Sequence, residues 1–347
     1  MPVQPIVIPT DTDWQQQLAN AVSDAVVLLR MLGLDLAWLS DRVDVETPFR
    51  LRVPHTYIAR MRHGDPDDPL LLQVLPARAE AIPSPGFSHD PVGDHDASIT
   101  PGLLHKYRGR VLLLTTGACG IHCRYCFRRH FPYAEANPAR SHWQEALAQI
   151  SADTSIEEVI LSGGDPLSLS DARLRELSKA LDVIPHLRRL RIHSRLPVVL
   201  PARITPGLLQ SLEATRLQTV MVIHANHAHE FDAEVDQALD RLRKAGVTLL
   251  NQSVLLKGVN DSSDALAALS ERMFQSGVLP YYLHLLDRVQ GAAHFEVPEA
   301  QALALMAELR ACLPGYLVPR LVREETGKGS KTPIIDTGIE TGIDTGI

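Results

Sequence analysis

From Arg110 onward, short apolar runs alternate with stretches whose apolar residues recur with the period of a helix. Continuous apolar strands that alternate with amphipathic helices predict a parallel sheet covered by helices. Six such units suit an incomplete barrel or a wide, curved sheet, because a full eight-fold barrel needs two more units and the sequence offers no clear candidates. The predicted strands are 110–116, 157–163, 187–194, 219–225, 247–256 and 280–286, and the predicted helices are 142–151, 171–182, 206–214, 230–245, 262–276 and 298–312.

The flanking segments have a different pattern. Residues 13–45 carry helical spacing, and Pro- and Asp-rich connections such as "HGDPDDP" follow. We therefore predict a helical, loop-rich region over 1–105, an α/β core over 106–320 and a C-terminal segment over 321–347. The ending "DTGIETGIDTGI" (336–347) repeats every four residues, which matches neither helical nor strand burial and predicts an exposed, flexible extension.

Composition narrows the class of protein. The chain is 45% hydrophobic and 22% charged, as in ordinary globular proteins, and no apolar run approaches the roughly 18 residues of a membrane helix. The start, "MPVQPIVIPTDTDW", lacks the basic and apolar segments of a secretory signal. A net charge of −7 argues against a general nucleic-acid binder. We expect a cytoplasmic protein without nucleic-acid or membrane partners, in which clustered cysteines indicate metal or redox chemistry.

Polar residues follow every predicted strand at its carboxyl end, where ligands bind in this class of fold. Six strand ends of this kind at one rim predict a single ligand site there. The residues concerned are Cys119, Cys123 and Cys126 after the first strand, 162–166 after the second, Ser194 and Arg195, His224 and Asn226, Asn251 and Gln252, and Asp287.

Three cysteines, Cys119, Cys123 and Cys126, fall within eight residues in "TTGACGIHCRYCFRRHF". A structural zinc site needs four ligands, so His122 or His130 would have to complete it. The alternative is an iron–sulfur cluster, in which three thiolates leave one of four irons open to bind a small molecule.

The spacing Cys-x3-Cys-x2-Cys, with Tyr125 before the third cysteine, resembles the radical S-adenosylmethionine (SAM) enzymes. The resemblance implies a [4Fe-4S] cluster whose open iron chelates SAM, which one electron cleaves to methionine and a 5′-deoxyadenosyl radical. It also implies that Gly163, Gly164 and Asp165 approach the amino end of SAM and that Tyr125 lies against the adenine. Glycines after a strand are often only a turn, so this tripeptide gains its meaning from the cysteines.

A longer resemblance covers residues 101–333. The segments "CRYCFRRHF", "LSGGDPL", "IHANH", "NQSVLLKGVND", "PYYLHLLD" and "GSKTP" are together similar to the lysine 2,3-aminomutases. The likeness implies a partial (β/α)6 radical SAM barrel with an N-terminal helical extension, and pyridoxal 5′-phosphate (PLP) as a further cofactor. By this match Lys331 is the PLP lysine, with Lys328 as a neighbouring cation that would help to activate it. Without the resemblance, a lysine in a Gly/Ser-rich loop is usually explained as a solvated charge on a flexible surface.

The resemblance also assigns a substrate site. Arg128 matches the position that binds the amino acid's carboxylate, although Arg124, Arg128 and Arg129 could instead balance an anionic cluster. Asp287 matches one of two acids that hold the side-chain ammonium of lysine, and Glu324 stands where the family has Asp. Tyr107 and Arg110, with help from Lys106, would contact the PLP phosphate. His224, Asn226, Asn251 and Gln252 are candidates for lining SAM or substrate, and each is equally an ordinary hydrogen-bonded residue at a strand end.

The implied reaction is the conversion of L-α-lysine to β-lysine by migration of the α-amino group. The compact length and the ending "LPGYLVPRLVREE" resemble the bacterial branch that supplies (R)-β-lysine to a lysyl ligase for modification of elongation factor P. A flavodoxin- or ferredoxin-type electron donor and a homo-oligomer are expected with it. The alternatives are a glutamate or arginine 2,3-aminomutase and, outside the enzymes, a zinc-stabilised interaction protein.

Overall fold

The ten strands of the structure, a computed structural model, form one sheet in the linear order β1 to β10. The residues described are 13–35, 37, 42–44, 47–133 and 140–335. The middle of the sheet is parallel and matches the six predicted strands. These strands are β3 (Arg110–Thr116), β4 (Glu158–Gly163), β5 (Arg189–Ser194), β6 (Gln218–Ile223), β7 (Thr248–Val254) and β8 (Leu279–His284).

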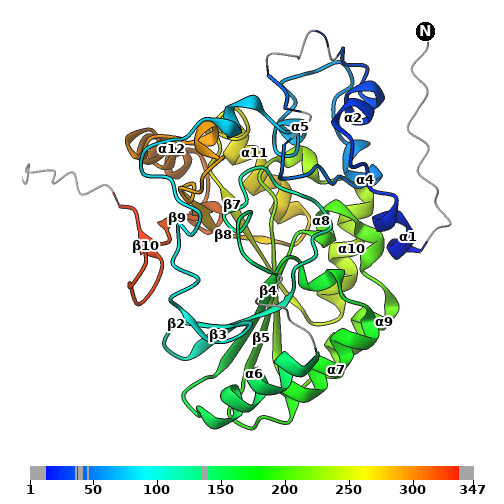
Figure 1. The fold of residues 1–347 in the computed structure, drawn as a ribbon, viewed down its shortest axis with the longest axis vertical. Coiled ribbons are helices and arrows are strands. Elements are labelled where there is room, and N and C mark those ends of the chain that lie inside the picture. The colour runs from blue at the N-terminus through cyan, green and yellow to red at the C-terminus, as the bar shows by residue number, and fades with distance from the viewer. Residues whose placement is uncertain (1–12, 36, 38–41, 45–46, 134–139, 336–347) are drawn as a thin grey trace, which may run out of the picture.

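Helices follow the parallel strands and cover one side of the curved sheet (Figure 1). They are α6 (Arg140–Ala152), α7 (Asp171–Asp182), α9 (Pro206–Glu213), α10 (Ala233–Lys244), α11 (Ser263–Gln275) and α12 (Glu299–Cys312). Four of them begin after a side chain that accepts a hydrogen bond from a first-turn N–H, namely Ser170, Thr205, Asp232 and Ser262. The predicted partial barrel of six β/α units is confirmed, with element boundaries within three residues of those predicted.

The edges of the sheet were not predicted. On one side β1 (Ser98–Thr100) and β2 (Leu103–Tyr107) add antiparallel to β3, so the boundary expected at residue 105 falls inside a strand. On the other side β9 (Arg320–Arg323) pairs parallel with β8, and the two-residue β10 (Thr332–Pro333) pairs antiparallel with β9. Strands this short carry too little periodicity to be recognised in sequence. Their consequence is that the C-terminal segment is part of the sheet.

The N-terminal region packs into the same hydrophobic core as the barrel. Its helices are α1 (Trp14–Ala19), α2 (Ala25–Met31), α4 (His55–Ile58) and α5 (Pro69–Leu72), and their buried apolar residues belong to one cluster with those of β3 to β7. The helical spacing predicted over 13–45 is interrupted after α1, where Val22 forms an isolated bridge with Val53. Residues 36, 38–41 and 45 of that prediction, and the repeat 336–347, lie outside the described residues.

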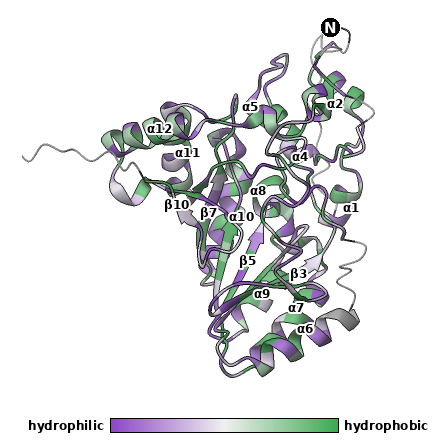
Figure 2. Ribbon diagram, turned by 60° about the vertical axis from the view of Figure 1, so that its left-hand side comes forward, coloured by the Kyte–Doolittle hydropathy of each residue, from purple (hydrophilic) through white to green (hydrophobic). Residues whose placement is uncertain are grey.

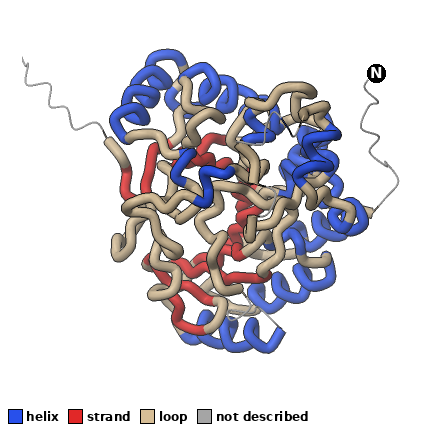
Figure 3. The backbone as a smooth tube through the Cα atoms, turned by 45° about the horizontal axis from the view of Figure 1, so that its top comes forward, coloured by secondary structure: helices blue, strands red, loops and turns tan. Residues whose placement is uncertain are grey.

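The layers follow hydropathy. Helices α6 and α7 show both apolar and polar residues in Figure 2, as expected of helices that cover a sheet with one face. Figure 3 shows the strands within an arc of helices, with loops across their ends. The remaining short elements are α8 (Leu196–Val199), η1 (Arg78–Ala81), η2 (Pro166–Ser168), η3 (Pro201–Arg203), η4 (Ala228–Glu230), η5 (Ala293–Phe295) and η6 (Gly315–Leu317). Among the described helices, none is long and apolar enough to cross a bilayer.

Candidate active site

A single cavity of about 430 Å³ brings together the candidate site residues. It reaches from the loops at the carboxyl ends of the strands into the curved sheet, where Val111 of β3 and Ile160 of β4 also line it. Asn226 and Asn251 lie outside its lining, but most of the residues that the sequence proposed for cofactor, substrate or metal binding contribute to its wall. These residues are Tyr107, Arg110, Cys119, Cys123, Tyr125, Cys126, Arg128, Gly163, Gly164, Asp165, His224, Gln252, Asp287, Glu324 and Lys331.

The cysteine loop between β3 and α6 is anchored to the N-terminal region through Glu80. Arg124 is fully buried and donates from Nε to Glu80 Oε1 over 2.7 Å, with a second contact from its Nη2. Arg129 donates from Nη2 to Glu80 Oε2 over 2.6 Å. Burial would raise the pKa of Glu80, but the two arginines hold it below its usual value. These two arginines are therefore structural ion-pair partners of Glu80.

The three thiols lie at one end of the cavity in a low-dielectric setting. Burial and the neighbouring thiols raise the pKa of Cys119 well above its usual value, and burial followed by Cys123 raises that of Cys126 to about 11. Three mutually repelling thiolates fit a cationic cluster that would neutralise them. Within the described residues, no group of three or more His, Cys, Asp or Glu side chains is placed to hold a single metal ion.

The Gly-Gly-Asp segment locks the end of β4 to the start of the cysteine loop. Gly164 N–H donates to the carbonyl of Thr116 over 2.7 Å, and Asp165 N–H donates to that of Ala118 over 2.8 Å. Gly163 has a φ of +120°, and a Cβ on Gly164 would lie 2.2 Å from the Ala118 oxygen. The sequence analysis expected glycine here because it leaves room for SAM. The structure gives a second reason for Gly164, because the backbone of the cysteine loop passes too close for a side chain.

Both carboxylate oxygens of Asp165 accept hydrogen bonds from groups within the protein. Its Oδ1 accepts from Ser194 Oγ over 2.7 Å, and its Oδ2 accepts from the Arg195 N–H over 2.8 Å. Burial raises the pKa of Asp165 above its usual value, although these donors oppose the effect. The carboxylate joins the ends of β4 and β5 and fixes the rim of the site.

Lys331 and Glu324 line the cavity and form an ion pair with each other. Lys331 Nζ donates to Glu324 Oε2 over 2.9 Å, and Tyr107 Oη donates to Glu324 Oε1 over 2.5 Å. Burial would raise the pKa of Glu324, but Lys331 and Tyr107 hold it below its usual value. Burial and Glu324 raise the pKa of Tyr107 far above its usual value, so its hydroxyl remains a donor. Lys328, expected to assist Lys331, is exposed and does not line the cavity.

Asp287 faces this pair without a partner. Within the described residues, its carboxylate makes no hydrogen bond or ion pair, although it lines the cavity. Burial raises the pKa of Asp287 to about 7, Lys331 opposes the shift and Glu324 adds to it. A half-buried carboxylate without a partner at a cavity wall can accept a cationic ligand group.

Arg128 lines the same cavity and is held by two neighbours. Its Nε donates to Asp94 Oδ2 over 2.7 Å, and its Nη1 donates to Ser162 Oγ over 3.0 Å. Asp94 is buried and also pairs through Oδ1 with Lys106 Nζ at 2.6 Å. The sequence pattern did not identify Asp94, because its Asp-rich loop has the composition of a turn and carries no further signal.

Several buried polar atoms of the cavity wall lack a hydrogen-bond partner. Each such atom costs about 1–3 kcal/mol unless a ligand satisfies it. Burial, and then the cations Arg195, Lys331 and Arg128, lower the pKa of His224 to about 3, so its imidazole is neutral at pH 7. The unpaired atoms include Nε2 of His193, His224 and His284, Oε1 of Gln252, and Nε of Arg129 and Arg195. The sequence analysis did not identify His193 and His284. They lie within the strands β5 and β8, and it considered mainly polar residues that follow the strands.

Asn226 and Asn251 do not line the cavity. The side chain of Asn251 exchanges hydrogen bonds with the backbone of Ala225, at 2.9 Å and 3.1 Å. Asn226 Nδ2 donates to Tyr125 Oη over 2.7 Å. These two residues are therefore ordinary hydrogen-bonded residues, which was the alternative interpretation of the sequence.

An open parallel sheet with three cysteines after its first parallel strand, and a Gly-Gly-Asp turn after the next, defines a radical SAM protein. The sequence profile of the Radical SAM superfamily matches residues 113–269. Membership implies a [4Fe-4S] cluster and SAM, which the thiols and the unpaired polar atoms of the cavity fit.

The comparison with whole proteins is more specific. The chain is 52% identical over 328 residues to the L-lysine 2,3-aminomutase of Escherichia coli K12, covering 94% of this chain and 95% of that one. It is 49% identical to the L-lysine 2,3-aminomutase of Haemophilus influenzae, covering 96% and 98%. To that of Clostridium subterminale it is 34% identical, covering 93% and 78%. The chain belongs to the lysine 2,3-aminomutase family of radical SAM isomerases.

Proposed function

We propose that the protein converts L-lysine to β-lysine with PLP as its third cofactor. The observation that carries the proposal is the pairing of charges in one cavity: Arg128 at one position, and Asp287 with Glu324 at another. A substrate with a carboxylate and a distant ammonium matches this distribution, since an arginine fork suits a carboxylate and an unpaired acid needs a cation.

Each side chain has a specific task under this proposal. Ser162 and Asp94 hold Arg128 by its Nη1 and Nε, so its remaining N–H groups are available to the substrate carboxylate. Asp287 accepts the ε-ammonium. Glu324 holds Lys331 in the free protein, and once that amine is engaged elsewhere, Glu324 can assist Asp287. A longer acid than the family Asp suits this double use, because it reaches both Tyr107 and Lys331.

Lys331 is the proposed attachment point for PLP. Its amine lies in the cavity, and Tyr107 and Arg110 line the same wall, where they would hold the phosphate. PLP when bound supplies a conjugated ring that delocalises an unpaired electron, and the cluster with SAM supplies the radical that removes hydrogen.

Borohydride trapping with peptide mapping tests this attachment. We expect the label on Lys331, loss of the PLP absorbance in Lys331→Ala and its retention in Lys328→Ala. Label on Lys328, or PLP absorbance that persists in Lys331→Ala, would contradict the assignment.

Product analysis tests the substrate. The protein would be reconstituted anaerobically with iron, sulfide, PLP, SAM and a reductant, and offered lysine, arginine and glutamate separately. We expect β-lysine alone, because glutamate would place a carboxylate against Asp287. β-Arginine or β-glutamate as the main product would replace lysine, and absence of any β-product from a preparation that cleaves SAM would refute the substrate proposal.

We further infer that the product is (R)-β-lysine for attachment to elongation factor P by a lysyl ligase. The support is the sequence identity, which is 52% to the Escherichia coli relative and 34% to the clostridial one. Chiral chromatography, followed by a ligase assay with the purified product, tests both parts. An (S) product, or a product that the ligase does not attach, would contradict this inference.

A reduced flavodoxin or ferredoxin is the proposed electron donor. The test is whether either reduced protein reduces the cluster, as followed by absorbance.

A further inference from the structure

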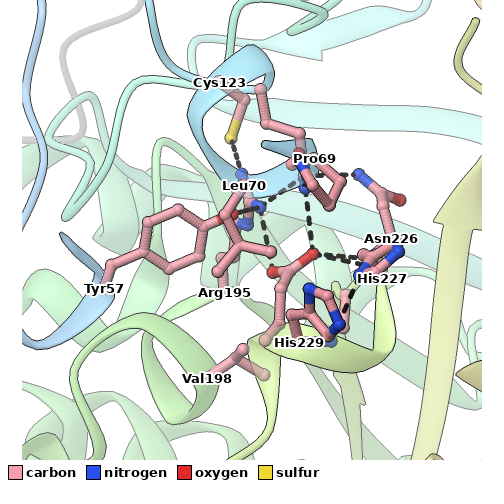
Figure 4. A network of polar contacts seen from close by, with 12 residues as sticks. Tyr57, Pro69, Leu70, Cys123, Arg195, Val198, Asn226, His227 and His229 are labelled. Atoms are coloured by element: carbon pink, nitrogen blue, oxygen red, sulfur yellow. Dashed lines mark hydrogen bonds and ion pairs between the residues drawn. The ribbon is translucent and has the colours of Figure 1, made fainter. Parts of the chain in front are cut away.

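Arg195 connects one of the three cysteines to a buried polar network. It follows β5, is 5% exposed, and donates from Nη1 to Cys123 Sγ over 2.8 Å. Figure 4 shows its side chain between Tyr57 and the sulfur of Cys123. A charged N–H group at this distance from a thiolate sulfur is a strong hydrogen-bond donor in a low-dielectric setting.

The network leaves the guanidinium little freedom. Its Nη2 donates to Gln73 Oε1 over 2.7 Å, to Glu230 Oε2 over 3.0 Å and to Tyr57 Oη over 3.1 Å. The Arg195 N–H is held by Asp165, which fixes the root of the side chain. Partners from four separate segments therefore aim Nη1 at the sulfur.

Glu230 is the counter-charge of this network. It is fully buried, and its Oε1 accepts from the Asn226 N–H over 2.8 Å and from the His227 N–H over 3.2 Å. Because backbone donors hold its other oxygen, Glu230 remains in place when the charge on Arg195 is altered. The protein thus places one cation in contact with the sulfur and one anion behind it.

We propose that Arg195 is a positioning residue that raises the reduction potential of the cluster held by Cys123, and that Glu230 limits this effect. A hydrogen bond and a positive charge at a ligating sulfur stabilise the extra electron of the reduced cluster. The buried carboxylate opposes this by partly neutralising the guanidinium. The proposal rests on the cysteine cluster site alone and is independent of lysine, PLP and the product.

The test is a redox titration of the reconstituted protein, followed by electron paramagnetic resonance without SAM or substrate. Arg195→Gln removes the cation and should disfavour the reduced cluster at least tenfold, which for a one-electron couple lowers the potential by 59 mV. Glu230→Gln removes the anion, keeps an acceptor, and should raise the potential. Opposite signs from two neighbouring variants distinguish charge tuning from general structural damage.

Arg203 provides a matched control. It is as deeply buried and donates to Asp171 Oδ1 over 2.8 Å and to the carbonyl of Leu169 over 3.0 Å, but makes no sulfur contact among the described residues. Arg203→Gln should leave the potential within the error of the wild type. Shifts of the same sign in Arg195→Gln and Glu230→Gln, or no shift in either at full iron content, would overturn the proposal. If the Arg195→Gln protein retains no cluster, the potential of the Glu230→Gln protein decides the matter. An unchanged or lowered potential in Glu230→Gln would then overturn the proposal.

Discussion

Asp287→Asn should stabilise the free protein while weakening substrate binding. The wild-type carboxylate faces the cavity without a hydrogen-bond or ion-pair partner among the described residues, and burial raises its pKa from 3.8 to about 7. The folded state therefore holds a proton that the unfolded state releases near pH 4, so the free energy of unfolding falls as the pH rises from about 4 to about 7. An asparagine does not titrate and avoids this loss.

The magnitude follows from the pKa difference. A rise from 3.8 to about 7 corresponds to about 4 kcal/mol at pH 8, and we expect about 2 kcal/mol because the carboxylate is partly exposed to the cavity. Urea unfolding of the cofactor-free protein at pH 5 and pH 8, followed by circular dichroism, measures it. The advantage of Asp287→Asn should grow by about 1–2 kcal/mol between these two pH values. The exposed Asp96→Asn serves as the control and should show no such growth.

The same substitution removes the acid proposed for the ε-ammonium. The KM for lysine should rise about 30-fold or more, because loss of one partner of a buried charge pair costs about 2–5 kcal/mol. In the wild type this KM should fall as the pH rises through about 7, since Asp287 then becomes ionised. An Asp287→Asn protein that is no more stable at pH 8 than the wild type, or whose advantage is independent of pH, would refute the electrostatic reasoning.

Three further substitutions test the site and its support. Gly164→Ala places a Cβ 2.2 Å from the Ala118 oxygen, so it should lower the free energy of unfolding by about 3 kcal/mol and displace the cysteine loop. Thermal unfolding and the iron content after reconstitution measure these two effects. Wild-type values of both would contradict the prediction. Arg124→Gln leaves the buried Glu80 with only Arg129 of its two arginine partners, and it should lower the free energy of unfolding by about 3–5 kcal/mol. A loss below about 1 kcal/mol would be inconsistent with a structural ion pair. Arg128→Gln should raise the KM for lysine about 30-fold with the cluster absorbance intact, and an unchanged KM would remove Arg128 from the substrate site.

The element order was predictable because its causes are local. The central strands are short runs rich in β-branched and apolar residues, and the helices between them carry apolar residues at helical spacing, so both signals survive in a linear sequence. The strands β1, β9 and β10 were not predictable, since they are two to four residues long and are stabilised by pairing with neighbours. The N-terminal region was expected as a leader, yet it supplies Glu80 to the cysteine loop and Asp94 to Arg128.

The sequence by itself indicated the radical SAM class, because the cysteine spacing and the Gly-Gly-Asp turn are short-range features. Only the tertiary structure decided how those groups are held. Arg195 meets Gln73 across 122 residues, and Tyr107 meets Glu324 across 217. Contacts at such separations leave no periodic trace in sequence, because they form only when the sheet brings distant loops to one rim. The charge state of Asp287 is likewise set by burial, a property of the folded chain and not of the residue.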